Sequence, residues 1–174
     1  MKNKTKWILI VFILSFILSI IFSGISTAMA ESFNTIILAI TIIVVIGIGI
    51  LFDMIGVAVL TCKESNLHAK AAKKMKGAKA AIALIKNSTK VSSVCNDVIG
   101  DICGIVSGSL GAALTLDLIG IIDISSVIIT MIVTATISAL TVGFKAIFKD
   151  VAEKNSDSIV YTVGKIISIF KKEK

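Results

Sequence analysis

The distribution of lysine along the chain restricts its fold more than any other feature. All 18 basic residues are lysines, and they fall in three blocks, at residues 2–6, 63–90 and 145–174. The long stretches between the blocks are apolar and contain no basic residue. This alternation is typical of membrane proteins, whose positively charged segments stay on the cytoplasmic side. The net charge of +7 therefore indicates an orientation in a bilayer, and it argues against a nucleic-acid-binding face.

Four apolar stretches are long enough to cross a bilayer, which requires roughly 20 helical residues. They cover residues 7–30, 34–62, 91–122 and 124–144, and their only charged residues are four aspartates. A hydrophobic fraction of 56% and a mean hydropathy of +1.00 exceed what a soluble domain of 174 residues can bury. The sequence predicts an all-α, polytopic membrane protein with four transmembrane helices.

The charge pattern also predicts a topology. The short connections around Glu31 and Asp123 lack lysine, whereas the 63–90 connection is rich in it. We therefore expect both termini and the 63–90 segment to be cytoplasmic, in a plasma or inner membrane. Residues 28–30 (Ala-Met-Ala) resemble a signal-peptide cleavage site, and cleavage would leave three spans. The first apolar stretch exceeds the usual signal core of about 7–15 residues, so we expect an additional N-terminal transmembrane helix over residues 1–30.

Two further segments have the spacing of amphipathic juxtamembrane helices. They are residues 67–85, within the lysine-rich linker, and the C-terminal residues 150–172. Such helices lie in the headgroup layer or pack beneath the transmembrane bundle. Their lysines either anchor the inner surface in a general way or recognise particular anionic lipids.

Aspartates inside the predicted spans are the leading candidates for function, because an ionisable residue in a bilayer is costly. Asp53 lies ten residues before Lys63, and Asp101 lies eleven residues after Lys90. At about 1.5 Å per helical residue, both lie ~15–17 Å from the inner boundary. The two spans are antiparallel, so we expect the two carboxylates at the same depth, facing one another.

Neither span contains a basic residue, so we expect that a bound cation or protons must neutralise these carboxylates. Asn96 and Asp97 lie one turn nearer the cytoplasm and add oxygen atoms. Oxygen ligands suit a hard cation such as Mg2+, with Na+ as the alternative. The glycines beside the aspartates are equally consistent with plain helix packing. A row of hydroxyls in the fourth span either lines an ion path or bonds back to its own helix, at Thr130, Thr134, Ser138 and Thr141.

The order of these parts resembles the transmembrane domain of the cyclin M / CorC family of magnesium transporters over residues 45–170. Residues 52–58 (Phe-Asp-Met-Ile-Gly-Val-Ala) are similar to the family's Phe-Ser-x-x-Glu-x-Ala, and residues 99–101 (Ile-Gly-Asp) to its Ile-Gly-Asn. Residues 76–79 and 84–87 resemble its juxtamembrane linker, and residues 143–149, with Ala152 and Asn155, the stretch after its last span. The family's serine and asparagine ligands correspond to Asp53 and Asp101, and its two glutamates to Gly56 and Phe144.

This resemblance implies a three-span domain over residues 31–174, Mg2+ as the cargo and a homodimer. The family's regulatory domains have no counterpart here, so nucleotide regulation would require a separate chain. The leading hypothesis is a membrane protein that transports or senses Mg2+, with Asp53 and Asp101 as direct ligands and Asn96 and Asp97 as a cytoplasmic vestibule. The alternative is a non-transporting scaffold or partner subunit with structural aspartates. An enzyme is not expected, because no nucleophile–base pair or Cys/His metal motif is present.

Overall fold

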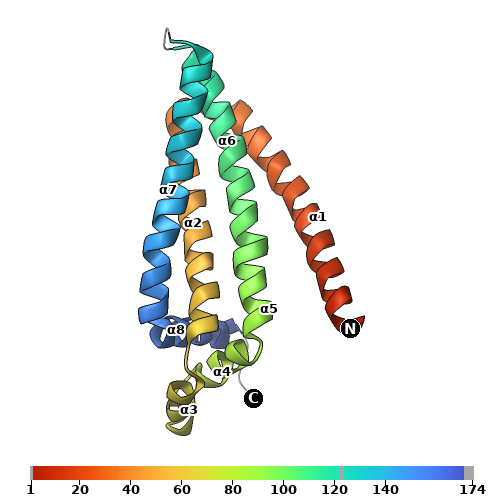
Figure 1. Ribbon diagram of the computed structural model, residues 1–174, viewed down its shortest axis with the longest axis vertical. Coiled ribbons are helices and arrows are strands. Elements are labelled where there is room, and N and C mark those ends of the chain that lie inside the picture. Colours follow the sequence, from red (N-terminus) through yellow and green to blue (C-terminus); the bar gives the residue numbers. More distant parts are fainter. Residues whose placement is uncertain (1, 122–123, 171–174) are drawn as a thin grey trace. The chain divides into compact units, whose positions relative to one another are not determined.

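The structure is a computed structural model that describes residues 2–121 and 124–170, and in these ranges the chain forms helices and turns but no strand (Figure 1). The fold class predicted from the sequence, all-α, is therefore confirmed for the described residues. The elements in chain order are α1 (Lys2–Ser32), α2 (Thr35–Thr61), α3 (Glu64–Ala72), α4 (Ala78–Lys86), α5 (Ser88–Ser92), the π-helix η1 (Ser93–Gly100), α6 (Asp101–Ile119), α7 (Ser126–Lys154) and α8 (Ser156–Phe170).

Four helical segments of the described chain are long and apolar enough to cross a membrane: Lys6–Ser32, Thr35–Thr61, Ser88–Ile119 and Ser126–Lys154. Each contains most of one predicted span, and the predicted turn residues 122–123 lie outside the described residues. The chain has no proline, so no residue of this type forces these long helices to end or kink. The prediction of four apolar helices is confirmed, and their insertion in a bilayer stays a prediction.

The chain divides into two compact units, one of residues 1–50 and 98–144 and the other of residues 51–97 and 145–174. In the first unit, α1 packs against α6. The hydroxyl of Thr35 donates a hydrogen bond to the carboxylate of Asp117 over 3.2 Å, which ties the start of α2 to the end of α6. Leu38 and Leu110 are fully buried in this unit.

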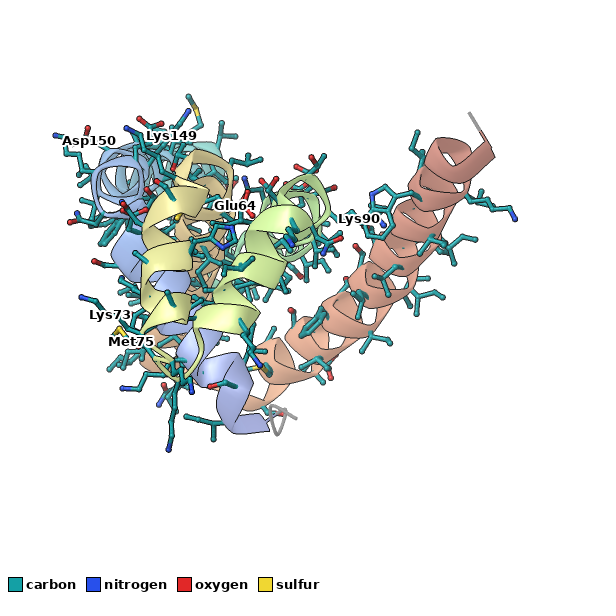
Figure 2. All side chains as sticks on the ribbon, turned by 90° about the horizontal axis from the view of Figure 1, so that it is seen from below. Glu64, Lys73, Met75, Lys90, Lys149 and Asp150 are labelled. Carbon is teal, nitrogen blue, oxygen red and sulfur yellow. The ribbon has the colours of Figure 1, made fainter. Side chains whose placement is uncertain are left out.

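The second unit contains α3, α4, α5 and α8, together with the last parts of α2 and α7 and residues 93–97 of η1. Its apolar core joins residues from both segments of the chain that form the unit: Ala58, Val59, Cys62, Leu67, Ala81, Ala152 and Val160. Figure 2 shows Lys73 and Met75 projecting from the turn between α3 and α4.

The predicted 67–85 helix is interrupted, which corrects the continuous spacing expected from the sequence. Residues 73–77 form the break between α3 and α4, where Lys74 has a φ of 54° and Gly77 a φ of 84°. At the C-terminus, residues 150–154 belong to α7, α8 covers Ser156–Phe170, and residues 171–172 lie outside the described residues. Whether these helices lie in the headgroup layer stays a prediction.

Helices α4 and α8 approach one another at two glycines. A Cβ atom on Gly164 would lie 2.7 Å from both the Cβ and the backbone nitrogen of Ala81 and 2.7 Å from the carbonyl oxygen of Gly77. A Cβ on Gly77 would lie 2.6 Å from the Cα of Lys165. These contacts involve backbone atoms, which cannot move aside as a flexible side chain can.

The substitution Gly164→Ala is therefore expected to destabilise the second unit. Overpacking of this kind costs about 1–3 kcal/mol, so the melting temperature of the purified protein in detergent should fall by several degrees. Gly143→Ala is the matched control, because a Cβ on this helical glycine meets nothing within 4 Å. It should leave the melting temperature unchanged or raise it. Equal melting temperatures for Gly164→Ala and the parent would show that α4 and α8 are not in close contact.

The predicted topology can be tested by labelling single cysteines with a membrane-impermeant maleimide in intact cells. Cysteines at Ser65 and Ser158, which are both exposed, should be labelled only after the cells are permeabilised. A cysteine at Ser125, in the predicted outer turn, should be labelled in intact cells. The parent protein gives the background from its native cysteines. Labelling of Ser65→Cys or Ser158→Cys from outside would refute the cytoplasmic placement of the linker and the tail.

Candidate functional site

The second unit places a positive partner beside Asp53. Asp53 lies on α2, Lys145 lies on α7, and the Lys145 Nζ is 3.6 Å from the Asp53 Oδ1. The two side chains are only 24% and 29% exposed, respectively, so the pair is largely shielded from solvent. The Asp53 carboxylate is therefore neutralised within the chain.

This ion pair corrects the expectation that only an external cation or protons can neutralise Asp53. The fourth apolar stretch ends at residue 144, but α7 continues to Lys154 and carries Lys145 as part of the same helix. The sequence contained no indication that this lysine faces Asp53, because the two residues come from distant parts of the chain. Ion pairs in such shielded places repay their desolvation only when the geometry is good.

Asn96 is the second notable polar group of this unit. It lies on η1, and its amide packs so closely on Gly56 of α2 that a Cβ at Gly56 would overlap it. The amide nitrogen donates to the Ser92 hydroxyl over 3.3 Å. The amide oxygen, Oδ1, is buried and has no hydrogen-bond donor among the described residues. Leaving such an acceptor unsatisfied costs about 1–3 kcal/mol, so a further partner is expected there.

Asp53 and Gly56 lie one turn apart on the same face of α2. Cys95, the neighbour of Asn96 in η1, lies within electrostatic range of Asp53. The carboxylate and the unsatisfied amide oxygen therefore belong to one region, where α2 meets η1. The π-helical geometry of η1 widens the helical turn at this point, and π-helical turns occur often at functional sites.

The other two predicted ligands are placed differently. Asp97 is exposed, and its carboxylate accepts a hydrogen bond from the Ser93 hydroxyl over 2.8 Å. Asp101 is the exposed first residue of α6 and belongs to the first unit. The juxtaposition of Asp53 and Asp101 stays a prediction. Within the described part of the chain, no group of three or more His, Cys, Asp or Glu residues lies together as a metal site would require.

Three threonine hydroxyls of the row in the fourth span donate to their own helix. Each donates to a carbonyl oxygen four residues earlier in α7, over 2.7–2.8 Å: Thr130 to Ser126, Thr134 to Thr130 and Thr141 to Ile137. The alternative that these hydroxyls bond back to their own helix is confirmed for these residues.

A polar cluster that the sequence did not reveal joins the end of α2 to the start of α8. The Cys62 thiol donates to the Asp157 Oδ1 over 3.1 Å, and the Asn66 amide donates to the Asp157 Oδ2. Nearby, the Lys70 ammonium lies 4.4 Å from the centre of the Tyr161 ring. We call Cys62, Asn66 and Asp157 the α2–α8 clasp.

The clasp shifts the ionisation of its own members. The Asn66 amide is the main cause that lowers the pKa of Asp157, and partial burial opposes it. Burial, reinforced by Asp157, raises the pKa of Cys62 to about 12, so this cysteine remains a neutral thiol at pH 7. Cys62 is thus a buried structural group that also donates a hydrogen bond.

In comparisons with known proteins, no family model, no curated protein and no solved structure matches this chain. The resemblance to the cyclin M / CorC family therefore stays a prediction that rests on the motifs in the sequence.

The clasp predicts a particular dependence of stability on pH. The pKa of Asp157 in the folded protein lies below the usual carboxyl value of 3.8. The ionised carboxylate therefore stabilises the fold above that value, and this contribution is lost as the pH falls through the folded pKa. Asp157→Asn should lower the melting temperature near pH 6 and make its decline between about pH 5 and pH 3 shallower.

The control for this experiment is Asp150→Asn, which removes a negative charge from the exposed surface of α7. It should leave the acid decline of the melting temperature as steep as in the parent. If Asp150→Asn and Asp157→Asn flatten the acid decline equally, the effect belongs to net charge and the clasp is not responsible.

Proposed function

We propose that the chain is a multi-pass protein of the plasma or inner membrane that binds a hard cation where α2 meets η1, and that it transports or senses this ion. Mg2+ is the first candidate, with Na+ as the alternative. The observation that carries the proposal is the buried Asn96 Oδ1, which has no donor among the described residues and lies beside Gly56, one turn from Asp53. An amide oxygen and a carboxylate are ligands that hard cations prefer.

The small number of protein ligands suits Mg2+ in particular. This ion keeps several of its waters and is commonly held by one or two carboxylates, so a dense acidic cluster is unnecessary. Asp53 would supply negative charge, and Asn96 a neutral oxygen. Asp101 is a further candidate ligand, and the exposed Asp97 would form part of a cytoplasmic vestibule. A homodimer belongs to the same proposal, because a Cβ on Gly104 or Gly108 of α6 would meet nothing within 4 Å in the single chain.

A second candidate function is a membrane scaffold or partner subunit that moves no ion. The ion pair between Asp53 and Lys145 favours it, because the pair gives the carboxylate a structural role without any ligand. The two candidates differ in what they expect of Asn96. In a scaffold, the buried Asn96 oxygen without a donor only costs stability. In an ion site, the same oxygen is available as a ligand.

The deciding measurement is the melting temperature of the purified protein in detergent, with and without about 10 mM Mg2+ or 150 mM Na+. Binding to the folded state alone stabilises it by RT ln(1 + [L]/Kd), so a bound ion should raise the melting temperature of the parent. Asn96→Leu should abolish this rise. Without the ion it should melt no lower than the parent, because it removes a buried unsatisfied oxygen. Asp53→Asn should also abolish the rise.

Asn155→Leu is the matched control, because Asn155 is exposed and its side-chain amide donates to the Val151 carbonyl oxygen of its own helix turn. It should keep the full response to Mg2+. If neither ion shifts the melting temperature of the parent, and if Asp53→Asn lowers it, the ion-binding proposal is refuted and the scaffold is supported.

A further inference from the structure

The geometry points to Lys145 as a tethered competing cation that occupies the Asp53 carboxylate in the absence of a bound ion and must leave it when an ion binds. This inference rests on the proposed ion site and names a residue that sets its affinity. It follows from three observations in the second unit: the length of the ion pair, the atom that the lysine leaves unsatisfied, and the surroundings of the lysine.

The ion pair is close enough for strong attraction but is not a tight hydrogen bond. The Nζ–Oδ1 distance is 3.6 Å, whereas charge-assisted hydrogen bonds between nitrogen and oxygen are typically about 2.7–2.9 Å long. In the same part of the chain, the exposed pair of Lys154 and Asp150 is 2.6 Å long. The Lys145 ammonium therefore neutralises Asp53 without being locked in place by short hydrogen bonds.

Lys145 is a partner for the Asp53 carboxylate but not for the Asn96 amide oxygen. It compensates the charge of Asp53, but the Asn96 Oδ1 is left without a donor. A metal ion with several coordination positions can bind the carboxylate and, directly or through its waters, the amide oxygen. An ion that enters would thus complete a site that the lysine leaves incomplete.

The ammonium and a metal ion cannot share the carboxylate. Two positive charges within a few ångströms repel strongly where the effective dielectric constant is low. The flexible stem of a lysine allows its ammonium to move toward water while the methylene groups remain on apolar surface. Further along α7, Lys149 is exposed at the end of the helix (Figure 2), so a displaced Lys145 ammonium has a polar region within reach.

Competition makes a quantitative prediction for Lys145→Gln, which removes the charge but keeps a similar length. If the lysine leaves the carboxylate open for about a tenth of the time, its removal lowers the apparent dissociation constant about tenfold. The factor should be the same for Mg2+ and Na+, because both ions displace the same lysine. Simple long-range repulsion by a fixed positive charge would act about twice as strongly, in free energy, on the divalent ion. The ratio of the two factors therefore separates competition from repulsion.

The experiment titrates the full-length protein in detergent with MgCl2 and with NaCl, following heat or the melting temperature. Lys149→Gln is the matched control, because it removes the same charge one turn away on the exposed surface. We expect tighter binding of both ions by Lys145→Gln, by equal factors, and unchanged binding by Lys149→Gln and Lys145→Arg. Unchanged or weaker Mg2+ binding by Lys145→Gln, in a parent that does bind Mg2+, would overturn the inference and leave the ion site intact. No ion binding by the folded parent and by Lys145→Gln would refute the ion site itself.

A second measurement needs no variant, so it remains decisive if Lys145→Gln does not fold. Acetic anhydride modifies free amines, and mass spectrometry reports the extent at each lysine. Saturating Mg2+ should increase the modification of Lys145 severalfold and leave Lys149 unchanged. Equal modification of Lys145 with and without Mg2+, under conditions where Mg2+ raises the melting temperature, would overturn the inference.

Discussion

For a chain proposed to cross a bilayer, the cost of placing polar groups in hydrocarbon is the constraint on which the rest of the structure depends. A chain that crosses a bilayer must satisfy its backbone internally, and long helices without proline do so. The same cost confines lysine to the segments outside the apolar stretches and makes every charge inside them exceptional. Asp53 is such an exception, and in the structure it forms an ion pair with Lys145. Lys145 reaches the carboxylate because α7 extends beyond the apolar stretch that ends at residue 144.

The features that the sequence predicted well are those that local composition decides. Each long apolar helix was predicted because a run of about 20 apolar residues has few other stable forms. Helix ends were predicted less well, because hydropathy reports where a segment stops being apolar, and helices continue through charged residues. Residues 145–154 contain no glycine or proline, so α7 continues to Lys154. Placing the end at residue 144 concealed Lys145 as a partner.

Features that depend on tertiary contacts could not be predicted. The α2–α8 clasp joins Cys62 to a carboxylate 95 residues away, and no local pattern marks either end of that contact. The break between α3 and α4 depends on positive φ values at Lys74 and Gly77, which the helical spacing of residues 67–85 does not reveal. The π-helical turns of η1 are equally absent from the pattern of apolar residues. In the candidate site, Asp53 and Asn96 were predicted because they are polar residues in apolar segments. The pairing of Asp53 with Lys145 and the unsatisfied oxygen of Asn96 could be found only from the folded structure.

The ion pair and the unsatisfied amide have to be considered together. Taken alone, the ion pair between Asp53 and Lys145 explains a half-buried aspartate, and it would serve a scaffold as well as a transporter. The Asn96 oxygen is not explained by that pair, because a lysine that is occupied with Asp53 leaves it without a donor. In the proposed ion site, the Lys145 ammonium would neutralise Asp53 when no ion is bound. The Asn96 oxygen would then give an incoming ion a contact that the ammonium does not make. Competition of this kind would keep the Asp53 carboxylate neutralised among apolar helices when no ion is bound. It would also keep the binding of the ion reversible.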